Sequence, residues 1–352
     1  MSLNRLRTRV ITPLFLAGLL GVFVAAAWAG KPGGGSPPPP PPGNIYFTGL
    51  VKSGGAVNEF SMRMRGDGSA KTRVSYGIPS NGLHGGDQSF LKTDVWYDAP
   101  YDEFGNPTTY VDLVANVLVN GQWQNIRLTS SRDIYWMSDD YAMAWSRDDS
   151  FISRPAIGVT ADGQPYGGLF VIPIQWTNGI PVAGSPTLVL KTDFNWVPES
   201  PFVSSVNVGE HDWSPDGQSL VFTARDQAGY ALYVADSAGA GIHRVTSGEF
   251  PQWSPDGRRI AFNTDTSNPE IWTINPDGST AVRLTQATST TKESRWQYFP
   301  TWSPDGAYLA YTQAVKSGNT TVRSVLRIPS AGGSAVNLTS DIAGGYWPRW
   351  RP

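Results

Sequence analysis

The sequence predicts an all-β protein, a six-bladed β-propeller of four-stranded antiparallel blades, from three observations. A phrase built on Trp-Ser-Pro-Asp-Gly occurs three times, at 211–222, 250–262 and 299–311. A shorter signature, in which Arg or Asn precedes an aliphatic residue and then Ser or Thr, recurs along the chain. The composition combines 38 Gly and 28 Pro with 14 Trp, 14 Tyr and 14 Phe. Such a composition is typical of many short strands joined by tight turns.

Each copy of the long phrase reads as a β-hairpin. In FPQWSPDGRRIAF, residues 250–262, the segment that ends at Trp253 makes a short first strand. Ser-Pro-Asp-Gly then reverses the chain, because proline presets φ, aspartate hydrogen-bonds locally and glycine accepts a positive φ. The alternating residues 260–262 make the second strand. Third strands are predicted at 231–239 and 270–278, and four strands in about 40–50 residues is the size of one propeller blade.

Six blades follow from counting the short signature, which closes each blade as its fourth strand. It occurs at Arg73-Val74-Ser75, Arg127-Leu128-Thr129, Arg244-Val245-Thr246, Arg283-Leu284-Thr285 and Asn337-Leu338-Thr339, with a weaker form at Leu188-Val189-Leu190. The long phrase adds a degraded copy that begins at Trp145 and a truncated copy at Trp350. Because GNIYFTG at 43–49 reads as a second strand without a first, the N- and C-terminal strands are expected to share one blade and close the ring.

The N-terminal residues predict export from the cytoplasm. Arg5, Arg7 and Arg9 precede an apolar run, and Ala27-Trp28-Ala29 supplies the small residues that a signal peptidase reads. We interpret residues 1–29 as a signal peptide cleaved after Ala29, which gives a periplasmic or secreted protein without stable membrane insertion. The alternative is an uncleaved anchor, since about 18 apolar residues can just span a bilayer. Without any cysteine, lipoprotein processing, disulfides and thiolate chemistry are excluded.

Residues 30–43, GKPGGGSPPPPPPG, form a Gly/Pro-rich linker. Six consecutive prolines favour an extended polyproline II conformation, so we interpret the segment as a semi-rigid spacer. Residues 44–352 are then the propeller.

The repeated W-S-P-D-G-x-x-[IL]-A-[FY] phrase, with its downstream D-G and R-[LV]-T, resembles the TolB-like β-propeller repeat, also called the PD40 or WD40-like repeat. The resemblance is clearest over 209–352 and weak over 44–208. It implies a propeller like that of the periplasmic component of the Tol–Pal envelope system. That component carries a separate α/β domain before its propeller, whereas here the propeller is expected to follow the linker directly. Similar repeats cover the hydrolase domain of prolyl-oligopeptidase-like enzymes, and here the chain is expected to end with the propeller.

The sequence predicts no catalytic, cofactor-binding or metal-binding residue, and hence no cofactor. It has no G-x-S-x-G, H-E-x-x-H or P-loop motif. His84, His211 and His243 are its three histidines, each interpreted as structural or solvent-exposed. The carboxylates Asp216, Asp256 and Asp305 lie in the repeated turns, so we interpret them as residues that shape the turn rather than as a catalytic or metal site. Two acidic segments, 263–270 and 98–106, only faintly resemble a calcium loop, so no metal is assigned.

The charge and the aromatic content of the chain indicate which classes of binding partner are plausible. The chain has 27 basic and 29 acidic residues without a basic face, which argues against a nucleic-acid partner. Several tryptophans outside the repeat could stack on sugar rings, although packing between blades is the stronger interpretation. These are Trp123, Trp136, Trp176 and Trp196.

These observations predict an exported, non-catalytic and monomeric β-propeller that acts as a protein-binding module in the bacterial cell envelope. Its partner would be an envelope protein or a lipoprotein, contacted through loops of the less regular half, around Ile78–Gln88 and Ala99–Thr108. A carbohydrate-binding protein or polysaccharide lyase-like propeller is the alternative. A structural module of an envelope complex, with no ligand of its own, is a third possibility.

Overall fold

The computed structural model describes residues 41–74, 93–98, 112–119, 122–128, 144–159, 165–192, 208–226 and 228–351. All of these residues belong to one compact unit, Pro40–Pro352. Their regular secondary structure is β-strand throughout, as the sequence predicts. Within these ranges, no helix is present that is long and apolar enough to cross a membrane.

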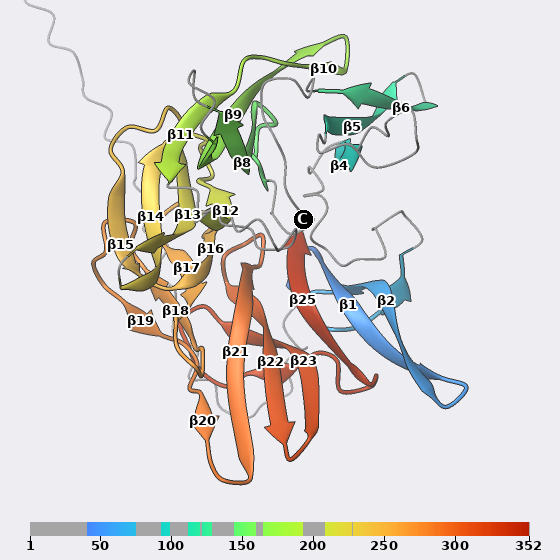
Figure 1. Ribbon diagram of the computed structural model, residues 1–352. Helices are drawn as coiled ribbons and strands as arrows, with labels where there is room; N and C mark the ends of the chain where they lie inside the picture. Colours follow the sequence, from blue (N-terminus) through green and yellow to red (C-terminus); the bar gives the residue numbers. More distant parts are fainter. Residues whose placement is uncertain are drawn as a thin grey trace, which may run out of the picture. The chain divides into compact units, whose positions relative to one another are not determined.

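The strands form six antiparallel sheets (Figure 1). The first pairs β25 (Gly344–Arg351), β1 (Asn44–Ser53), β2 (Ala56–Arg65) and β3 (Thr72–Arg73). The second contains β4 (Thr93–Asp98), β5 (Asp112–Val119) and β6 (Gln122–Arg127), and the third contains β7 (Ala144–Trp145), β8 (Phe151–Val159), β9 (Pro165–Thr177), β10 (Ile180–Ala183) and β11 (Thr187–Thr192).

The remaining three sheets follow the chain in the same way. They contain β12 (Val208–Trp213), β13 (Ser219–Asp226), β14 (Gly229–Asp236) and β15 (His243–Ser247); β16 (Glu249–Trp253), β17 (Ile260–Asn263), β18 (Ile271–Ile274) and β19 (Val282–Arg283); and β20 (Thr288–Ser289), β21 (Glu293–Trp302), β22 (Tyr308–Ser317), β23 (Thr320–Pro329) and β24 (Val336–Asn337).

Two sheets have five strands rather than the expected four, because hairpins extend them. Asn178 and Gly179 both have positive φ, 53° and 78°, so a tight two-residue turn folds β10 back onto β9. The short strand β20 likewise pairs with the start of β21. The expected closing strands are found where the signature places them. Arg73, Arg127, Val189, Arg244, Arg283 and Asn337 lie in β3, β6, β11, β15, β19 and β24.

The repeated turn satisfies its own polar groups. Ser214 Oγ donates to Asp216 Oδ1 and accepts the N–H of Ser219 at 2.9 Å. Asp216 also accepts the N–H of Gln218 at 3.1 Å. The same contacts recur at Ser146–Asp148, Ser254–Asp256 and Ser303–Asp305. The degraded copy that begins at Trp145 therefore folds as the intact copies do.

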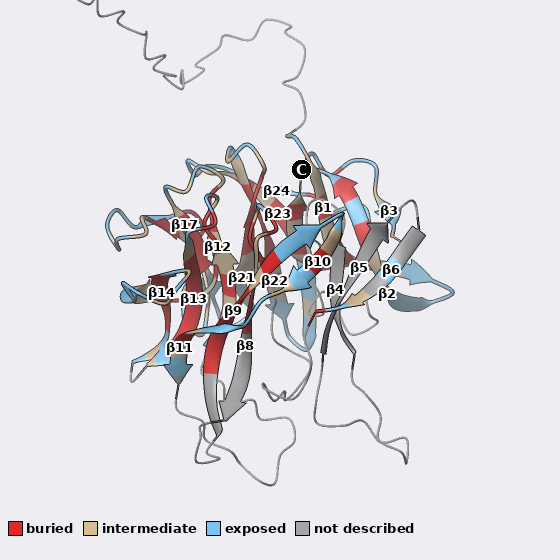
Figure 2. Ribbon diagram, turned by 90° about the horizontal axis from the view of Figure 1, so that it is seen from above, coloured by how far each residue is buried: buried red, intermediate tan, exposed pale blue. Residues whose placement is uncertain are grey.

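Each repeat tryptophan joins its own sheet to the preceding one. Trp213 is fully buried and packs with Leu169 and Val171 of the third sheet. Corresponding clusters surround Trp145, Trp253, Trp302 and Trp350. The indole N–H groups add hydrogen bonds between sheets, from Trp213 to the carbonyl of Ala144 at 3.2 Å and from Trp302 to that of Gln252 at 3.1 Å. The core of the described chain thus lies along and between the sheets (Figure 2).

The first and last strands share one sheet. β1 pairs with β25 in a register that sets Asn44 opposite Arg351 and Ile45 opposite Trp350. β1 also pairs with β2 over its whole length, so it lies between the two. The strand that begins the described chain is therefore held on one side by the strand that ends it.

Candidate functional site

Five half-buried aromatic side chains meet on three neighbouring strands, and we call them the aromatic cluster: Phe250 of β16, Tyr298 and Phe299 of β21, and Tyr346 and Trp347 of β25. Phe299 is the centre. Its ring centroid lies 4.3 Å from that of Phe250, 4.7 Å from that of Tyr298 and 5.8 Å from that of Trp347, all in edge-to-face arrangements. Tyr346 extends the cluster at 5.0 Å from Trp347. Edge-to-face contacts of this kind are favourable for aromatic pairs.

The backbone of this cluster is strained at equivalent positions of three repeats. Phe250, Phe299 and Trp347 have φ of 55°, 58° and 54°. A positive φ is uncommon for bulky residues, and each of these residues also precedes a proline, which disfavours helical conformations. The strand register shifts at each position, as in a β-bulge. Because such strain persists only where the surroundings impose it, and concentrates at functional sites, the cluster is a candidate binding surface.

Side chains of the preceding sheet hold two of these bulges. The N–H of Trp347 donates to Thr312 Oγ1 at 3.0 Å, and the N–H of Phe299 makes a longer contact of 3.4 Å with Asn263 Oδ1. Both acceptors are fully buried, Thr312 on β22 and Asn263 on β17. Their burial leaves the acceptor oxygens little freedom, so the bulge position is fixed from beneath.

Charged groups border the cluster on two sides. Burial, together with the nearby Asp265 and Glu210 carboxylates, raises the pKa of Glu249 to about 7. Burial also raises the pKa of Glu210, although the charge of Arg349 opposes the shift. On the other side, Arg323 Nε donates to the hydroxyl of Tyr298 at 3.2 Å. The guanidinium carbon of Arg323 also lies 5.8 Å from the ring centroid of Tyr346.

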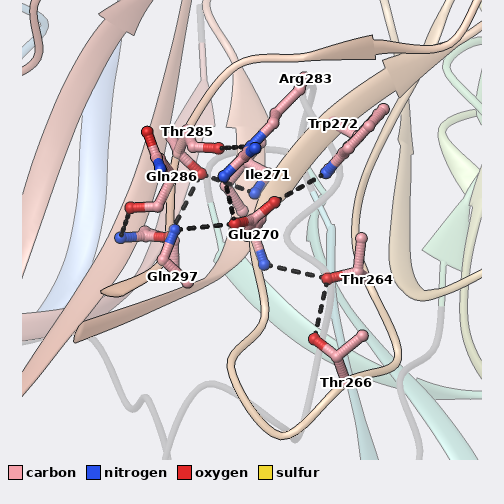
Figure 3. Close-up of polar contacts among 10 residues, drawn as sticks. Thr264, Thr266, Glu270, Ile271, Trp272, Arg283, Thr285, Gln286 and Gln297 are labelled. Carbon is pink, nitrogen blue, oxygen red and sulfur yellow. Dashed lines mark hydrogen bonds and ion pairs between the residues drawn. The ribbon is translucent and has the colours of Figure 1, made fainter. Parts of the chain in front are cut away.

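A polar network next to the cluster fixes the loop between β17 and β18 (Figure 3). Glu270 accepts hydrogen bonds from Arg283 Nη2 at 2.7 Å, from the N–H of Ala287 at 2.9 Å and from Trp272 Nε1 at 3.3 Å. Thr285 Oγ1 accepts the N–H of Ile271 at 2.8 Å and donates to Gln297 Oε1 at 3.3 Å. Because Gln297 directly precedes Tyr298, the network positions the part of β21 that carries the cluster.

The segment 263–270, which faintly resembles a calcium loop, does not bring its oxygens together. Asn263 points to Phe299, Asp265 accepts the N–H of Tyr230 at 2.9 Å, and Glu270 pairs with Arg283. Among the residues that the structure describes, no group of three or more His, Asp or Glu side chains could hold a metal ion. The aspartates of the repeated turns are bonded within those turns, as the turn chemistry predicts.

The two histidines in the described ranges lie on the two outer strands of one sheet, the sheet of β12–β15. His211 is buried on β12 at the position where other copies have proline, which matches its predicted packing role. His243 is exposed on β15, with ring nitrogens 2.9 Å from the carbonyl oxygen of Gly241 and 3.1 Å from that of Pro276. His84 lies outside the described residues.

Among the predicted contact loops and the candidate sugar-stacking tryptophans, Trp176 is the one whose side chain the structure describes. The loops 78–88 and 99–108 and the side chains of Trp123, Trp136 and Trp196 lie outside the described residues. Trp176, on β9, is 37% exposed. Its Nε1 donates to the carbonyl of Asp149 at 3.0 Å, and its ring lies 6.4 Å from that of Trp145. It therefore offers one aromatic face in a fixed orientation.

Sequence reasoning missed the aromatic cluster. The signal was present, because Phe-Pro precedes the repeat tryptophan at 250 and 299, and Trp-Pro does so at 347. From the sequence alone, each of these residues marks only the start of a strand. The aromatic side chains come together because three strands that are distant in sequence lie next to one another in the fold.

Comparison with known proteins agrees with this fold. Residues 203–344 match the model of the TolB β-propeller domain, PD40. An uncharacterized protein of Agrobacterium fabrum is 40% identical over 83 residues, which cover 22% of this chain and 28% of that protein. Dipeptidyl-peptidase 5 of Porphyromonas gingivalis is 29% identical over 77 residues, 18% of this chain and 11% of that enzyme. The matches thus span less than a third of either relative's length.

The fold extends beyond the matched segment. TolB from Acinetobacter baumannii superposes with a TM-score of 0.55 over 88% of this chain and 67% of that structure, at 17% identity. At this identity the likeness concerns the fold alone. Residues 203–344 thus match the TolB β-propeller (PD40) domain family, and the described part of the chain has a TolB-like propeller fold.

Proposed function

We propose that this chain is an exported, non-catalytic, monomeric β-propeller that binds a protein partner in the bacterial cell envelope, and that the aromatic cluster is its contact surface. The observation that carries the proposal is the set of strained backbones at Phe250, Phe299 and Trp347. Protein interfaces concentrate their binding energy in aromatic and arginine residues, and Arg323 lies against Tyr298 and Tyr346 of the cluster.

The proposal includes a closed ring of six blades. The six sheets of the described chain and the pairing of β1 with β25 support it. A closed ring leaves only short, protected strand edges, which suits a protein that must stay soluble after export. Residues 1–29 would be the leader removed after Ala29, with 30–43 as the spacer that follows. N-terminal sequencing of the exported protein should then begin at Gly30, whereas retention of Met1–Ala29 would identify an anchor.

The binding proposal is tested by photocrosslinking in cells. A photoreactive amino acid replaces Tyr298, inside the cluster, or Tyr230, an aromatic residue of β14 that is 38% exposed. We expect one dominant crosslinked envelope protein from position 298 and not from position 230. That protein, once purified, should bind the Phe299→Ala variant at least about tenfold more weakly than the unmodified chain. Unchanged affinity in Phe299→Ala would show that the cluster is not the contact surface.

Carbohydrate binding remains the second candidate, and Trp176 is the observation that favours it. An exposed indole whose N–H is already bonded presents its ring face for stacking on a sugar. A glycan array with the unmodified chain and Trp176→Ala separates the two functions. Glycan binding that is lost in Trp176→Ala, and kept in Phe299→Ala, would favour the carbohydrate alternative.

A further inference from the structure

The end of the proline-rich linker contacts three separate elements of the propeller. Trp350 Nε1, on β25, donates to the carbonyl of Pro42 at 3.0 Å. A Cβ built on Gly43 would lie 2.9 Å from Cγ of Pro304, in the turn between β21 and β22. A Cβ built on Gly66, just after β2, would lie 2.7 Å from the carbonyl oxygen of Pro41. The segment Pro41–Gly43 thus contacts both the first sheet, through Trp350 and Gly66, and the sheet of β20–β24, through Pro304.

The hydrogen bond from Trp350 differs from those of Trp213 and Trp302, whereas the indole N–H groups of Trp145 and Trp253 have no hydrogen-bond partner within the described chain. Trp213 and Trp302 donate their indole N–H groups to Ala144 and Gln252, which directly precede the repeat tryptophan of the preceding sheet. The same rule would give Trp350 the carbonyl of Thr301. Instead, the side-chain oxygen of Thr301 accepts the backbone N–H of Trp350 at 3.1 Å, and the indole N–H of Trp350 donates to the linker.

Gly66 leaves room for this contact. Its backbone conformation does not require glycine, because its φ is not among the positive values. A Cβ at this position would nevertheless come within 2.6 Å of Cζ2 of Trp350 and 3.1 Å of Cβ of Pro41. Gly66 is itself held in place, since its carbonyl accepts a hydrogen bond from Arg327 Nη1 at 2.9 Å. Glycine therefore serves here for close approach alone.

We propose that Trp350, Gly66 and Pro304 form a proline-binding site that the chain's own Pro41–Gly43 segment occupies, and that this contact latches β25 against β1. An indole N–H that donates to a carbonyl of a proline-rich segment, beside an apolar surface, is a recurring way of recognising polyproline II. The occupied site fixes the point at which the spacer leaves the propeller. It also ties the final strand of the chain to the segment just before its first strand.

The variant Gly66→Ala tests the contact, because its Cβ would lie 2.6 Å from Cζ2 of Trp350 and 3.1 Å from Cβ of Pro41. We expect Gly66→Ala to accelerate hydrogen exchange of the Trp350 indole N–H at least about tenfold. Gly54→Ala is the control and should leave this exchange unchanged, because a Cβ there meets nothing within 4 Å. Unchanged exchange in a Gly66→Ala variant of native circular dichroism would overturn the proposal.

A second measurement avoids any change at Gly66. Hydrogen exchange of the indole N–H groups is followed by NMR in the unmodified chain and in Pro41→Gly/Pro42→Gly, which frees the segment but keeps its carbonyls. We expect exchange at Trp350 to accelerate at least about tenfold, with Trp302 unchanged as the internal reference. Unchanged exchange at Trp350 would show that its indole does not depend on the linker and would also overturn the proposal.

Discussion

Asp149 and Gly217 occupy the same position in two successive copies of the repeated turn, and both have a positive φ, 57° and 68°. Gly257 and Gly306 fill this position in the other copies, at 70° and 69°. Asp149 is therefore the one residue with a Cβ among these four. The left-handed conformation costs a non-glycine residue about 1–2 kcal/mol.

Replacing Asp149 by glycine should stabilise the protein. Relief of the strained conformation outweighs the added freedom of the unfolded chain, so we expect Asp149→Gly to raise the free energy of unfolding by roughly 1 kcal/mol. The bond from Trp176 uses the backbone carbonyl and is retained. Urea unfolding measures the change. Gly217→Asp is the matched control and should destabilise, and a less stable Asp149→Gly variant would contradict the strain argument.

Glu249 should make stability depend on pH. Its folded pKa of about 7 lies above the ordinary value of 4.5 because of burial and the neighbouring Asp265 and Glu210. The folded state therefore holds the proton more tightly, and this contribution is fully present below pH 4.5 and is lost as pH rises through 7.

We expect the unmodified chain to lose stability relative to Glu249→Gln between pH 5 and pH 8. Thermal unfolding of both proteins across that range measures the difference. A gap that stays constant with pH would show that Glu249 titrates normally.

Thr312 and Thr223 allow a matched test of the bonds beneath the cluster. Both are fully buried at equivalent positions of the second strands. Thr312 Oγ1 accepts the N–H of Trp347, whereas Thr223 Oγ1 makes no hydrogen bond within the described part of the chain. Thr312→Val should cost about 1–3 kcal/mol, because it leaves a backbone N–H without an acceptor. Thr223→Val should be neutral or stabilising in the same unfolding assay, and equal effects would refute this distinction.

Glu270 should contribute more to the free energy of unfolding than an exposed glutamate does. It accepts from Arg283, Ala287 and Trp272, and its side chain is 18% exposed. Truncation in Glu270→Ala should cost about 1–3 kcal/mol of unfolding free energy. The exposed carboxylate of Glu293 pairs with the exposed Arg295, and its backbone bonds to Thr290 are kept in Glu293→Ala, which should change stability by less than about 1 kcal/mol. The two values, compared by urea unfolding, test whether the network of Figure 3 holds its loop.

The strands and turns could be predicted from the sequence because their signals are local. Ser146 and Asp148 keep the turn geometry even where the proline and glycine of the phrase are lost. The degraded copy can therefore be recognised from these two residues. The closing signatures likewise mark last strands, because Thr285 and Thr339 each use a hydroxyl to accept a backbone N–H of the neighbouring strand.

The aromatic cluster could not be predicted, because local preference opposes it. Phe250, Phe299 and Trp347 adopt a φ that their side chains and the following proline both disfavour. Tertiary contacts across three sheets impose that conformation, and no spacing in the sequence reports them. The added strands β10 and β20 escaped prediction for a related reason, since each is only a short extension of a neighbouring hairpin.

The Ser–Asp turn affects how easily a protein of this kind could gain further repeats. Every hydrogen bond that shapes it is made inside the phrase itself. A duplicated repeat would therefore keep its turn structure. Only its tryptophan would need to pack against the preceding sheet. A single duplication could therefore add a blade whose turn folds without any change elsewhere in the chain.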